Sequence, residues 1–269
     1  MVIYKKYRYN GFIRRIKKTN YTKRKDKNMT EKKKSGSILD LPERETNEGI
    51  TFPVSEEELC RRYRAVTTPM VNDVLRSMGL IYQTLPTNIL PLREEMKMCG
   101  VVFTIKGSKN LALENEMEQR AAMLESICAN TVCVWDTCGD DESAQWGEIM
   151  TMAAKKRGCL GAIIDGGVRD TDKVLEQKFP VFCRYRTSNG MLGRFRLIGY
   201  QIPIRIGDVT ILPGDIVCAD IDGCIIVPRK IAWQVLLEAE QIVENEIAIK
   251  KMVNDGATPT DVVKNGGYF

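Results

Sequence analysis

The sequence contains no histidine among its 269 residues. Without an imidazole group, Ser-His-Asp and Cys-His catalysis, H-E-x-x-H zinc sites and histidine general bases are excluded within the chain. Any chemistry must therefore come from carboxylates, arginine, lysine, tyrosine, cysteine, backbone N–H groups or a bound metal ion.

Long apolar runs are also missing. No run approaches the roughly 20 apolar residues of a membrane span, and residues 1–35 contain neither an apolar h-region nor a small-residue cleavage site. Nine cysteines are scattered along the chain without a C-x-x-C pair, which argues against a zinc ribbon or a thioredoxin-type motif. We therefore expect a cytoplasmic protein with no membrane association, whose cysteines are reduced core thiols.

Positive charge is concentrated at the N-terminus. Residues 1–35 carry 14 Lys and Arg side chains against Asp26 and Glu31, whereas the rest of the chain has an acidic excess of seven. Such a basic arm can bind nucleic acid or an anionic membrane, act as a targeting peptide, or be a solvated, disordered extension, which we favour. Translation starting at Met29 is a further alternative. The acidic body argues against nucleic-acid binding outside the tail.

The hydrophobic pattern predicts one α/β domain over residues 54–269, preceded by the basic extension and a loop-like lead-in over residues 1–53. Ser55-Glu56-Glu57-Glu58 is a capping-box pattern that opens a helix to about Val66. Thr68 is predicted to cap a second helix, with Pro69 at its first position.

Strands and helices then alternate, before the pattern changes near Pro180 to closely spaced strands. Short strands separated by turn signals indicate a curled sheet or barrel segment. The predicted strands are 99–105, 131–135, 161–164, 181–185, 202–206, 209–212, 216–220 and 224–227, and the predicted later helices are 116–128, 147–157 and 229–253.

The stretch from Trp146 to Asp172 holds the candidate site. A helix is predicted to begin at Gly147, so the free N–H groups of Gly147 to Met150 would bind an anion. After the strand at 161–164, a loop is predicted to present Arg169 beside Asp170.

These residue types suit a 2-oxo acid, whose carboxylate and carbonyl oxygens chelate a hard cation. Asp170 is the best single Mg²⁺ ligand, and Arg169 would neutralise charge that develops on the carbonyl oxygen. Glu148 and the acidic loop 136–142 would form an outer layer around the ion. The alternative for Arg169 and Asp170 is a structural ion pair in a turn.

Four motifs occur in an order that resembles a known family, the regulator-of-ribonuclease-activity-A-like (RraA-like) proteins, which include class II 4-hydroxy-4-methyl-2-oxoglutarate aldolases. The resemblance covers roughly residues 54–269. The motifs are Trp-Gly-Glu-Ile-Met at 146–150, Gly-Ala-Ile-Ile-Asp-Gly-Gly-Val-Arg-Asp at 161–170, Phe-Pro-Val-Phe at 179–182, and Pro-Gly-Asp-Ile-Val-Cys-Ala-Asp-Ile-Asp-Gly at 213–223.

The resemblance implies an α/β sandwich around a β-barrel-like core, of the swivelling β/β/α type. It also implies a homotrimer or homohexamer with active sites at subunit interfaces. Within the site, it implies substrate arginine Arg169, metal ligand Asp170, and Glu246, with Glu244 nearby, contributed by a neighbouring subunit. The implied substrate-binding backbone segment is Gly147, Glu148, Ile149 and Met150.

The implied activity is that of a divalent-metal-dependent lyase using Mg²⁺ or Mn²⁺. Its reaction would be cleavage of a 4-hydroxy-2-oxo dicarboxylate, decarboxylation of oxaloacetate, or both, through a pyruvate enolate. The alternative function is a non-catalytic interaction protein that regulates a ribonuclease. A methyltransferase is disfavoured, because Asp165-Gly166-Gly167 is not the G-x-G-x-x-G nucleotide fingerprint.

For two further groups of residues, the sequence leaves two possible roles open. Lys106, at the end of a strand, is either a Schiff-base lysine or an ordinary surface lysine. Arg184, Arg186 and Arg194 either bind a second substrate carboxylate or are exposed strand-edge arginines.

Overall fold

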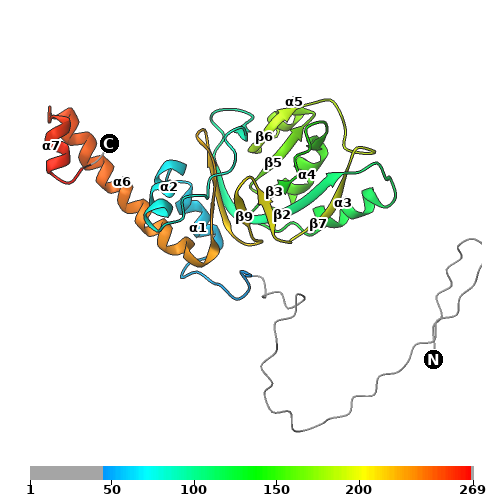
Figure 1. The fold of residues 1–269 in the computed structure, drawn as a ribbon, viewed down its shortest axis with the longest axis horizontal. Helices are drawn as coiled ribbons and strands as arrows, with labels where there is room; N and C mark the ends of the chain where they lie inside the picture. Colours follow the sequence, from blue (N-terminus) through cyan, green and yellow to red (C-terminus); the bar gives the residue numbers. More distant parts are fainter. Residues whose placement is uncertain (1–44, 268–269) are drawn as a thin grey trace, which may run out of the picture. The chain divides into compact units, whose positions relative to one another are not determined.

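The computed structural model describes residues 45–267, and Figure 1 shows how their helices and strands are arranged. Most of the predicted basic extension, residues 1–44, lies outside this part of the chain. The elements in chain order are α1 (Glu56–Tyr63), α2 (Thr68–Ser77), β1 (Leu90–Pro91), β2 (Met98–Lys109), α3 (Glu116–Glu125), β3 (Thr131–Asp136), β4 (Ala144–Trp146), α4 (Glu148–Lys156), β5 (Gly161–Val168), α5 (Thr171–Glu176), β6 (Val181–Arg186), β7 (Phe195–Tyr200), β8 (Ile204–Ile206), β9 (Val209–Ile211), β10 (Ile216–Asp220), β11 (Gly223–Val227), η1 (Arg229–Ile231), α6 (Ala232–Asn254) and α7 (Pro259–Lys264).

The sheet is nearly closed on itself. Its strand order is β1-β6-β5-β3-β2-β10-β11, with β4 added beside β5 and β7 beside β2. Strands β2, β3, β5 and β6 are mutually parallel, whereas β10 runs antiparallel to both of its neighbours, β2 and β11. Thr84 pairs with Ile225 on one edge, while Leu90 pairs with Cys183 on the other, so the segment between them links the two edges. The predicted α/β fold around a barrel-like core is confirmed.

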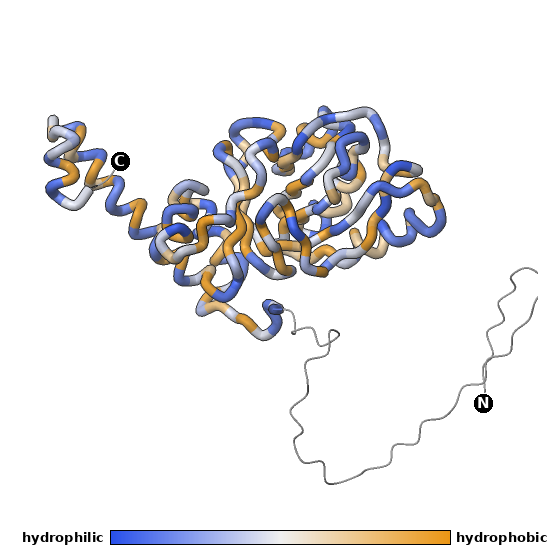
Figure 2. The backbone as a smooth tube through the Cα atoms, viewed as in Figure 1, coloured by the Kyte–Doolittle hydropathy of each residue, from blue (hydrophilic) through white to orange (hydrophobic). Residues whose placement is uncertain are grey.

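Residues alternate between the inside and the outside of the sheet, as the two-residue period of a strand requires. Val102, Val134 and Ile163 point inward, where the separate β8–β9 hairpin contributes Ile206 and Ile211 to the same cluster. The strands are accordingly the most hydrophobic part of the chain in Figure 2, whereas α6 alternates along its length.

Two groups of helices cover the outer face. Helices α3, α4 and α5 pack through residues such as Met123, Ala154 and Val174 against the outward side chains of the parallel strands. Helices α1, α2 and α6 form a second cluster on β10 and β11. The long strand β2 joins both clusters, because Val101 belongs to the second and Phe103 to the first.

Strand β5 extends four residues beyond its predicted end, so the prediction of a loop beginning at Asp165 was wrong. The two glycines Gly166 and Gly167 are needed there for close packing rather than for a turn. A Cβ atom at Gly166 would overlap Oε1 of Gln145, and one at Gly167 would overlap the Tyr185 ring. Thus β5 carries the chain directly to Arg169.

The start of α2 also differs from prediction. Thr67, not Thr68, occupies the capping position. The Thr68 backbone N–H and hydroxyl both donate to Asp220, at 2.8 and 2.6 Å, so the carboxylate at the end of β10 anchors the first turn of the helix. At α1, the predicted cap is confirmed, since Ser55 Oγ accepts from the Glu58 N–H at 3.2 Å.

The remaining expectations concern cysteines, the lead-in and membranes. All nine cysteines are free, and seven of them are buried, as predicted for core thiols. Part of the lead-in packs on the domain, because Asn47 donates to Asp215 at 2.9 Å. Across residues 45–267, no helix combines the length and the apolar character that crossing a bilayer requires.

A row of charges crosses four neighbouring parallel strands. Lys106 on β2 pairs with Asp136 on β3 at 2.5 Å, and Arg184 on β6 lies 3.6 Å from Asp165 on β5. Burial raises the pKa of Asp165 to about 6, although Arg184 lowers it, while Asp136 adds to the rise. The fold therefore favours the protonated form of this carboxyl group.

We expect Asp165→Asn to make the protein more stable than wild type at neutral pH and not at pH 4. Stability that derives from a raised carboxyl pKa is complete below the unfolded pKa and is lost as the pH rises through about 6. Melting temperatures of both proteins, measured from pH 4 to pH 8, should diverge by a few degrees. Asp222→Asn, in the exposed β10–β11 turn, is the control. A difference in melting temperature between Asp165→Asn and wild type that stays constant or narrows as the pH rises would contradict this prediction.

Candidate active site

The junction of β4 and α4 supplies unpaired backbone N–H groups. Helix α4 begins after Gly147, which has an extended conformation and gives no side-chain cap. The first helical hydrogen bond runs from Thr151 N–H to Gly147 O at 3.0 Å. The amides of Glu148, Ile149 and Met150 therefore precede the hydrogen-bonded part of the helix and can bind an anion.

Side chains hold this junction in place. The indole N–H of Trp146 donates to the Thr151 hydroxyl at 2.8 Å, and that hydroxyl donates to Gly147 O at 2.9 Å. Trp146 also stacks on Phe179, with ring centroids 6.3 Å apart. The helix start is thus fixed by buried groups before any ligand arrives.

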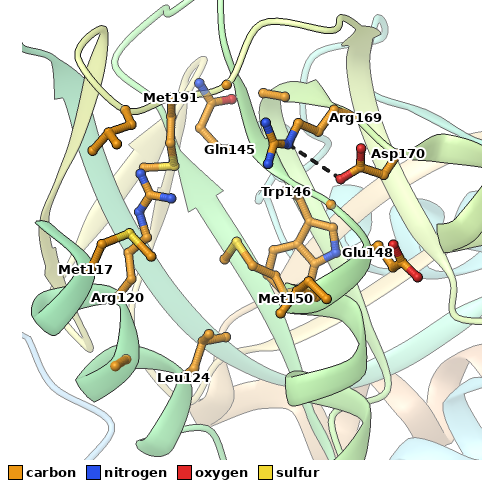
Figure 3. A pocket seen from close by; sticks show the side chains of 16 residues that line it. Met117, Arg120, Leu124, Gln145, Trp146, Glu148, Met150, Arg169, Asp170 and Met191 are labelled. Atoms are coloured by element: carbon orange, nitrogen blue, oxygen red, sulfur yellow. Dashed lines mark ion pairs between the residues drawn. The ribbon is translucent and has the colours of Figure 1, made fainter.

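Arg169 and Asp170 follow directly from the end of β5 and face this junction. The backbone N–H of Arg169 donates to the backbone carbonyl of Trp146 at 3.0 Å, and this bond ties the turn to β4. Arg169 Nε lies 3.5 Å from Asp170 Oδ2, and both side chains are about half exposed, at 49% and 45%. Figure 3 shows this ion pair at the rim of the pocket, with the Glu148 carboxylate on the same side as Asp170.

Two glycines let these groups approach one another. A Cβ atom at Gly147 would lie 3.0 Å from Asp170 Oδ2, and one at Gly190 would lie 2.8 Å from Arg169 Nη1. Asp170 has a left-handed backbone conformation, φ +51°, and caps α5. Asp adopts this conformation more readily than most residues, and such backbones are common at functional sites.

A cavity of about 540 Å³ lies between these elements. One wall is the β4–α4 junction, the second is the Arg169–Asp170 turn, the third is α3 and the fourth is the segment 190–192 before β7. Its middle is apolar, with Leu124, Met150 and Met191 around it (Figure 3). A shallower hollow of about 470 Å³ shares Arg169 and Asp170 and is lined by Arg186.

Within residues 45–267, the cavity has too few carboxylates to surround a metal ion with protein ligands. It has enough for a divalent ion whose other ligands are water and substrate. Asp170 and Glu148 both line the cavity. In the part of the chain that the structure describes, no group of three or more Cys, Asp or Glu side chains converges as a metal site would require. Mg²⁺ commonly binds through one or two carboxylates, with water and substrate completing its shell, and Asp170 meets that requirement.

The structure separates the other predicted residues from the cavity. Asp136 and Asp140 of the acidic loop are buried structural groups: Asp136 holds Lys106, and Asp140 accepts from Gln145 at 2.6 Å. The acidic residues of loop 136–142 do not line the cavity within this chain, and their role around a metal ion stays a prediction. Within this chain, Glu246 on α6 does not line the cavity and pairs with Lys250 at 2.7 Å.

The arginines proposed for a second carboxylate are also placed elsewhere. Arg184 pairs with Asp165, and Arg194 donates to Gly190 O at 3.3 Å. Besides Arg169, the cavity is lined by Arg120 on α3, which was not identified from the sequence. Its signal was the spacing of Glu116 and Arg120, four residues apart on a predicted helix, which favours an ion pair.

The chain is similar to known proteins in both sequence and fold. Residues 68–226 match the family model described as RraA-like: Aldolase/RraA. "Protein DlpA" of Legionella pneumophila is 28% identical over 188 residues, which are 70% of this chain, but the chain spans only 30% of that protein's length. A protein of Halalkalibacterium halodurans named "Putative 4-hydroxy-4-methyl-2-oxoglutarate aldolase" is 26% identical over 201 residues, covering 75% of this chain and 91% of that protein.

Solved structures show the same architecture. A structure described as novel cellulases from microbes associated with the gut ecosystem is 48% identical, with a TM-score of 0.72, and the match covers 74% of this chain and 89% of that one. Streptomyces coelicolor RraAS2, described as an unusual member of the RNase ES inhibitor RraA protein family, is 25% identical with a TM-score of 0.67 and coverage of 74% and 99%.

We expect Asp170→Asn and Arg169→Gln to leave the melting temperature within about 2 °C of wild type, because a half-exposed ion pair contributes about 0–1 kcal/mol. Asn also tolerates the left-handed backbone. Asp170→Val is the matched contrast, since a β-branched side chain is strained at φ +51°, and it should lower the melting temperature by several degrees. Equal destabilisation by Asn and Val would show that the carboxylate is a structural group.

Proposed function

This chain belongs to the RraA-like family, and we propose that it is a divalent-metal-dependent lyase that acts on 2-oxo acids. The proposed reactions are cleavage of a 4-hydroxy-2-oxo dicarboxylate of the 4-hydroxy-4-methyl-2-oxoglutarate type and decarboxylation of oxaloacetate. The name of the Halalkalibacterium relative supports the first reaction. Both reactions pass through the enolate of pyruvate.

One observation carries the proposal: Arg169 and Asp170 line the same cavity as the free amides at the start of α4. In the proposed complex, the Ile149 and Met150 amides bind the substrate's C1 carboxylate. Arg169 donates to the C2 carbonyl oxygen, where negative charge grows as the enolate forms. Groups fixed before the reaction stabilise such charge without reorganisation.

Asp170 would hold Mg²⁺ or Mn²⁺, and Glu148, which lines the same cavity, would lie outside the ion's direct ligands. When bound, such an ion polarises the carbonyl oxygen as a Lewis acid. For the aldol cleavage, the C4 hydroxyl loses its proton, the C3–C4 bond breaks, and C3 of the enolate is later protonated. Since the chain has no histidine, we assign the movement of these protons to carboxylates, with Glu148 the nearest candidate in the cavity.

A Schiff-base mechanism fits less well. Lys106 forms an ion pair with Asp136 and does not line the cavity. Burial lowers the pKa of Lys106, but its bonds to Asp136 and Cys138 outweigh that effect and leave the pKa raised. A Schiff-base lysine needs a lowered pKa to be a neutral nucleophile, so the ordinary ion-paired reading of Lys106 is favoured.

A polysaccharide substrate also fits less well, despite the description of the 48% identical structure. Two guanidinium groups, Arg120 and Arg169, line the cavity together with unpaired amides. A neutral sugar chain has no anionic group for these guanidinium and amide donors, whereas a carboxylate would form charge-assisted hydrogen bonds with them. The cavity therefore supports a small anionic ligand.

We further propose that a neighbouring copy of the chain completes the site. Apolar side chains at the rim are exposed, including Ile149 at 69%, Met117 at 61% and Leu192 at 50%. Contiguous exposed apolar groups are typical of protein interfaces. In the proposed homotrimer or homohexamer, Glu246 from one copy reaches the cavity of the next and shares in proton transfer.

The purified protein should release pyruvate from 4-hydroxy-4-methyl-2-oxoglutarate and from oxaloacetate. EDTA should abolish the activity, and added Mg²⁺ or Mn²⁺ should restore it, because Asp170 supplies the main protein ligand. Asp170→Asn and Arg169→Gln should each lower kcat/KM by about 100-fold or more. Glu176→Gln, on the exposed face of α5, is the control and should retain activity.

Full turnover in excess EDTA, or normal turnover by folded Asp170→Asn protein, would contradict the assignment. An inert wild-type protein that instead captures a ribonuclease would support the alternative role as a regulator, which the description of the Streptomyces structure suggests for that protein.

Subunit complementation tests the shared site. Asp170→Asn and Glu246→Gln proteins should each be inactive alone, because every site would lack one carboxylate. Co-expression of the two chains should recover part of the activity, since a mixed oligomer contains some sites with both groups intact. A fully active Glu246→Gln protein, or mixed oligomers without any recovery, would contradict the shared site.

A further inference from the structure

Helix α3 carries a buried carboxylate, Glu116, behind the cavity-lining Arg120, and Arg196 of β7 lies against the same carboxylate. Glu116 is 1% exposed. Its Oε1 accepts from Arg120 Nε at 2.8 Å and from the Leu197 N–H at 3.4 Å, and its Oε2 lies 3.4 Å from Arg196 Nε. Two guanidinium groups against one carboxylate leave an excess positive charge in this wall.

The two arginines differ in how many of their guanidinium N–H donors have hydrogen-bond partners. Arg196 has a second partner, since its Nη2 donates to Glu114 O at 2.8 Å. Arg120 is only 16% exposed, and within the described residues its Nη2 is buried without a hydrogen-bond partner, as is Oε2 of Glu116. A buried donor on a charged group is costly to leave unpaired. Arg120 is therefore the group in this wall that needs an added acceptor.

The guanidinium group of Arg120 points into the cavity. In Figure 3 it rises from α3 beside Met191, on the other side of the cavity from the Arg169–Asp170 pair. Apolar side chains such as Leu124 and Met150 lie between the two ends. The cavity thus has a cationic group at each end and an apolar middle, which suits a short carbon chain with two anionic groups.

We infer that Arg120 is a specificity-determining residue that binds the second carboxylate of a 2-oxo dicarboxylate, while the first carboxylate binds at the start of α4. Glu116 is its positioning residue, because the bond to Nε fixes the direction of the guanidinium group. This inference rests on the proposed function for the placement of the first carboxylate. It predicts that the site binds 2-oxo dicarboxylates more tightly than 2-oxo acids with an apolar tail.

Arg186 is the competing arginine. It lines the shallower hollow beside Asp170 and donates to Leu92 O at 3.2 Å. Its residue is exposed, so water satisfies its remaining donors. Arg120 is less accessible to water, and an acceptor that reached its unpaired donor would remove an existing cost as well as form a new bond.

The test compares the binding of 2-oxoglutarate and 2-oxopentanoate, which have the same length and differ by a carboxylate in place of a methyl group. Calorimetry of the wild-type protein with Mg²⁺ should show 2-oxoglutarate binding about 10- to 100-fold more tightly, the range expected for a hydrogen-bonded charge pair. Arg120→Met should lose this preference by weakening 2-oxoglutarate binding alone. Arg120→Lys, which keeps the charge, should retain part of it.

Three further variants test whether Glu116 positions Arg120 and whether other arginines contribute to the preference. Glu116→Gln should reduce the preference less than Arg120→Met, while Arg186→Met and the distant, exposed Arg61→Met should leave it unchanged. If Arg120→Met proves unstable because Glu116 loses a partner, the double variant Glu116→Gln/Arg120→Met removes both groups and should show the same loss of preference.

No preference in the wild type, a preference that survives in folded Arg120→Met, or one lost only in Arg186→Met would overturn the inference. These binding results are independent of turnover. A protein that cleaves 4-hydroxy-4-methyl-2-oxoglutarate but does not prefer the dicarboxylate refutes the role of Arg120 alone. A protein that shows the preference and releases no pyruvate refutes the proposed lyase instead.

Discussion

The close approach of Gly147 to the Arg169–Asp170 turn is the constraint on which the site depends. Strands β4 and β5 run parallel, so both deliver their carboxyl ends to the same edge of the sheet. The bond from Arg169 N–H to Trp146 O then fixes the turn against the helix start, in a space where a Cβ at Gly147 would reach Asp170. Strand register, this backbone hydrogen bond and the absence of a side chain at Gly147 together bring a cation, a carboxylate and free amides into one place.

The sequence was most informative where chemistry and local structure coincide. The absence of histidine alone directs attention to carboxylates, arginines and amides as the reactive groups. The start of α4 after Gly147 and the adjacent charges at 169 and 170 were predicted from short motifs, and the structure places them in one cavity. The closely spaced strands after Pro180 indicated a curled sheet; β10 and β11 do extend the nearly closed sheet, whereas β8 and β9 form a separate hairpin.

What the sequence could not supply are the contacts between distant segments. Gly166 and Gly167 read as a turn because glycine usually signals one, yet they belong to a strand that packs tightly on Gln145 and Tyr185. Arg120 was missed because α3 and the Arg169–Asp170 turn after β5 are far apart in the sequence and line one cavity only in the folded protein. Strand β7, which brings Arg196 to Glu116, was missed for the same reason.

The central claim is that the start of α4 and Arg169 hold a 2-oxo acid at its carboxylate and carbonyl oxygens. Oxalate resembles the planar enolate of pyruvate, so a crystal structure of the protein with oxalate and Mg²⁺ tests the claim most directly. The account predicts oxalate oxygens within hydrogen-bonding distance of the Ile149 or Met150 amide and of the Arg169 guanidinium, with the ion on Asp170. Oxalate bound away from these groups, or Arg169 turned out of the cavity in its presence, would contradict it.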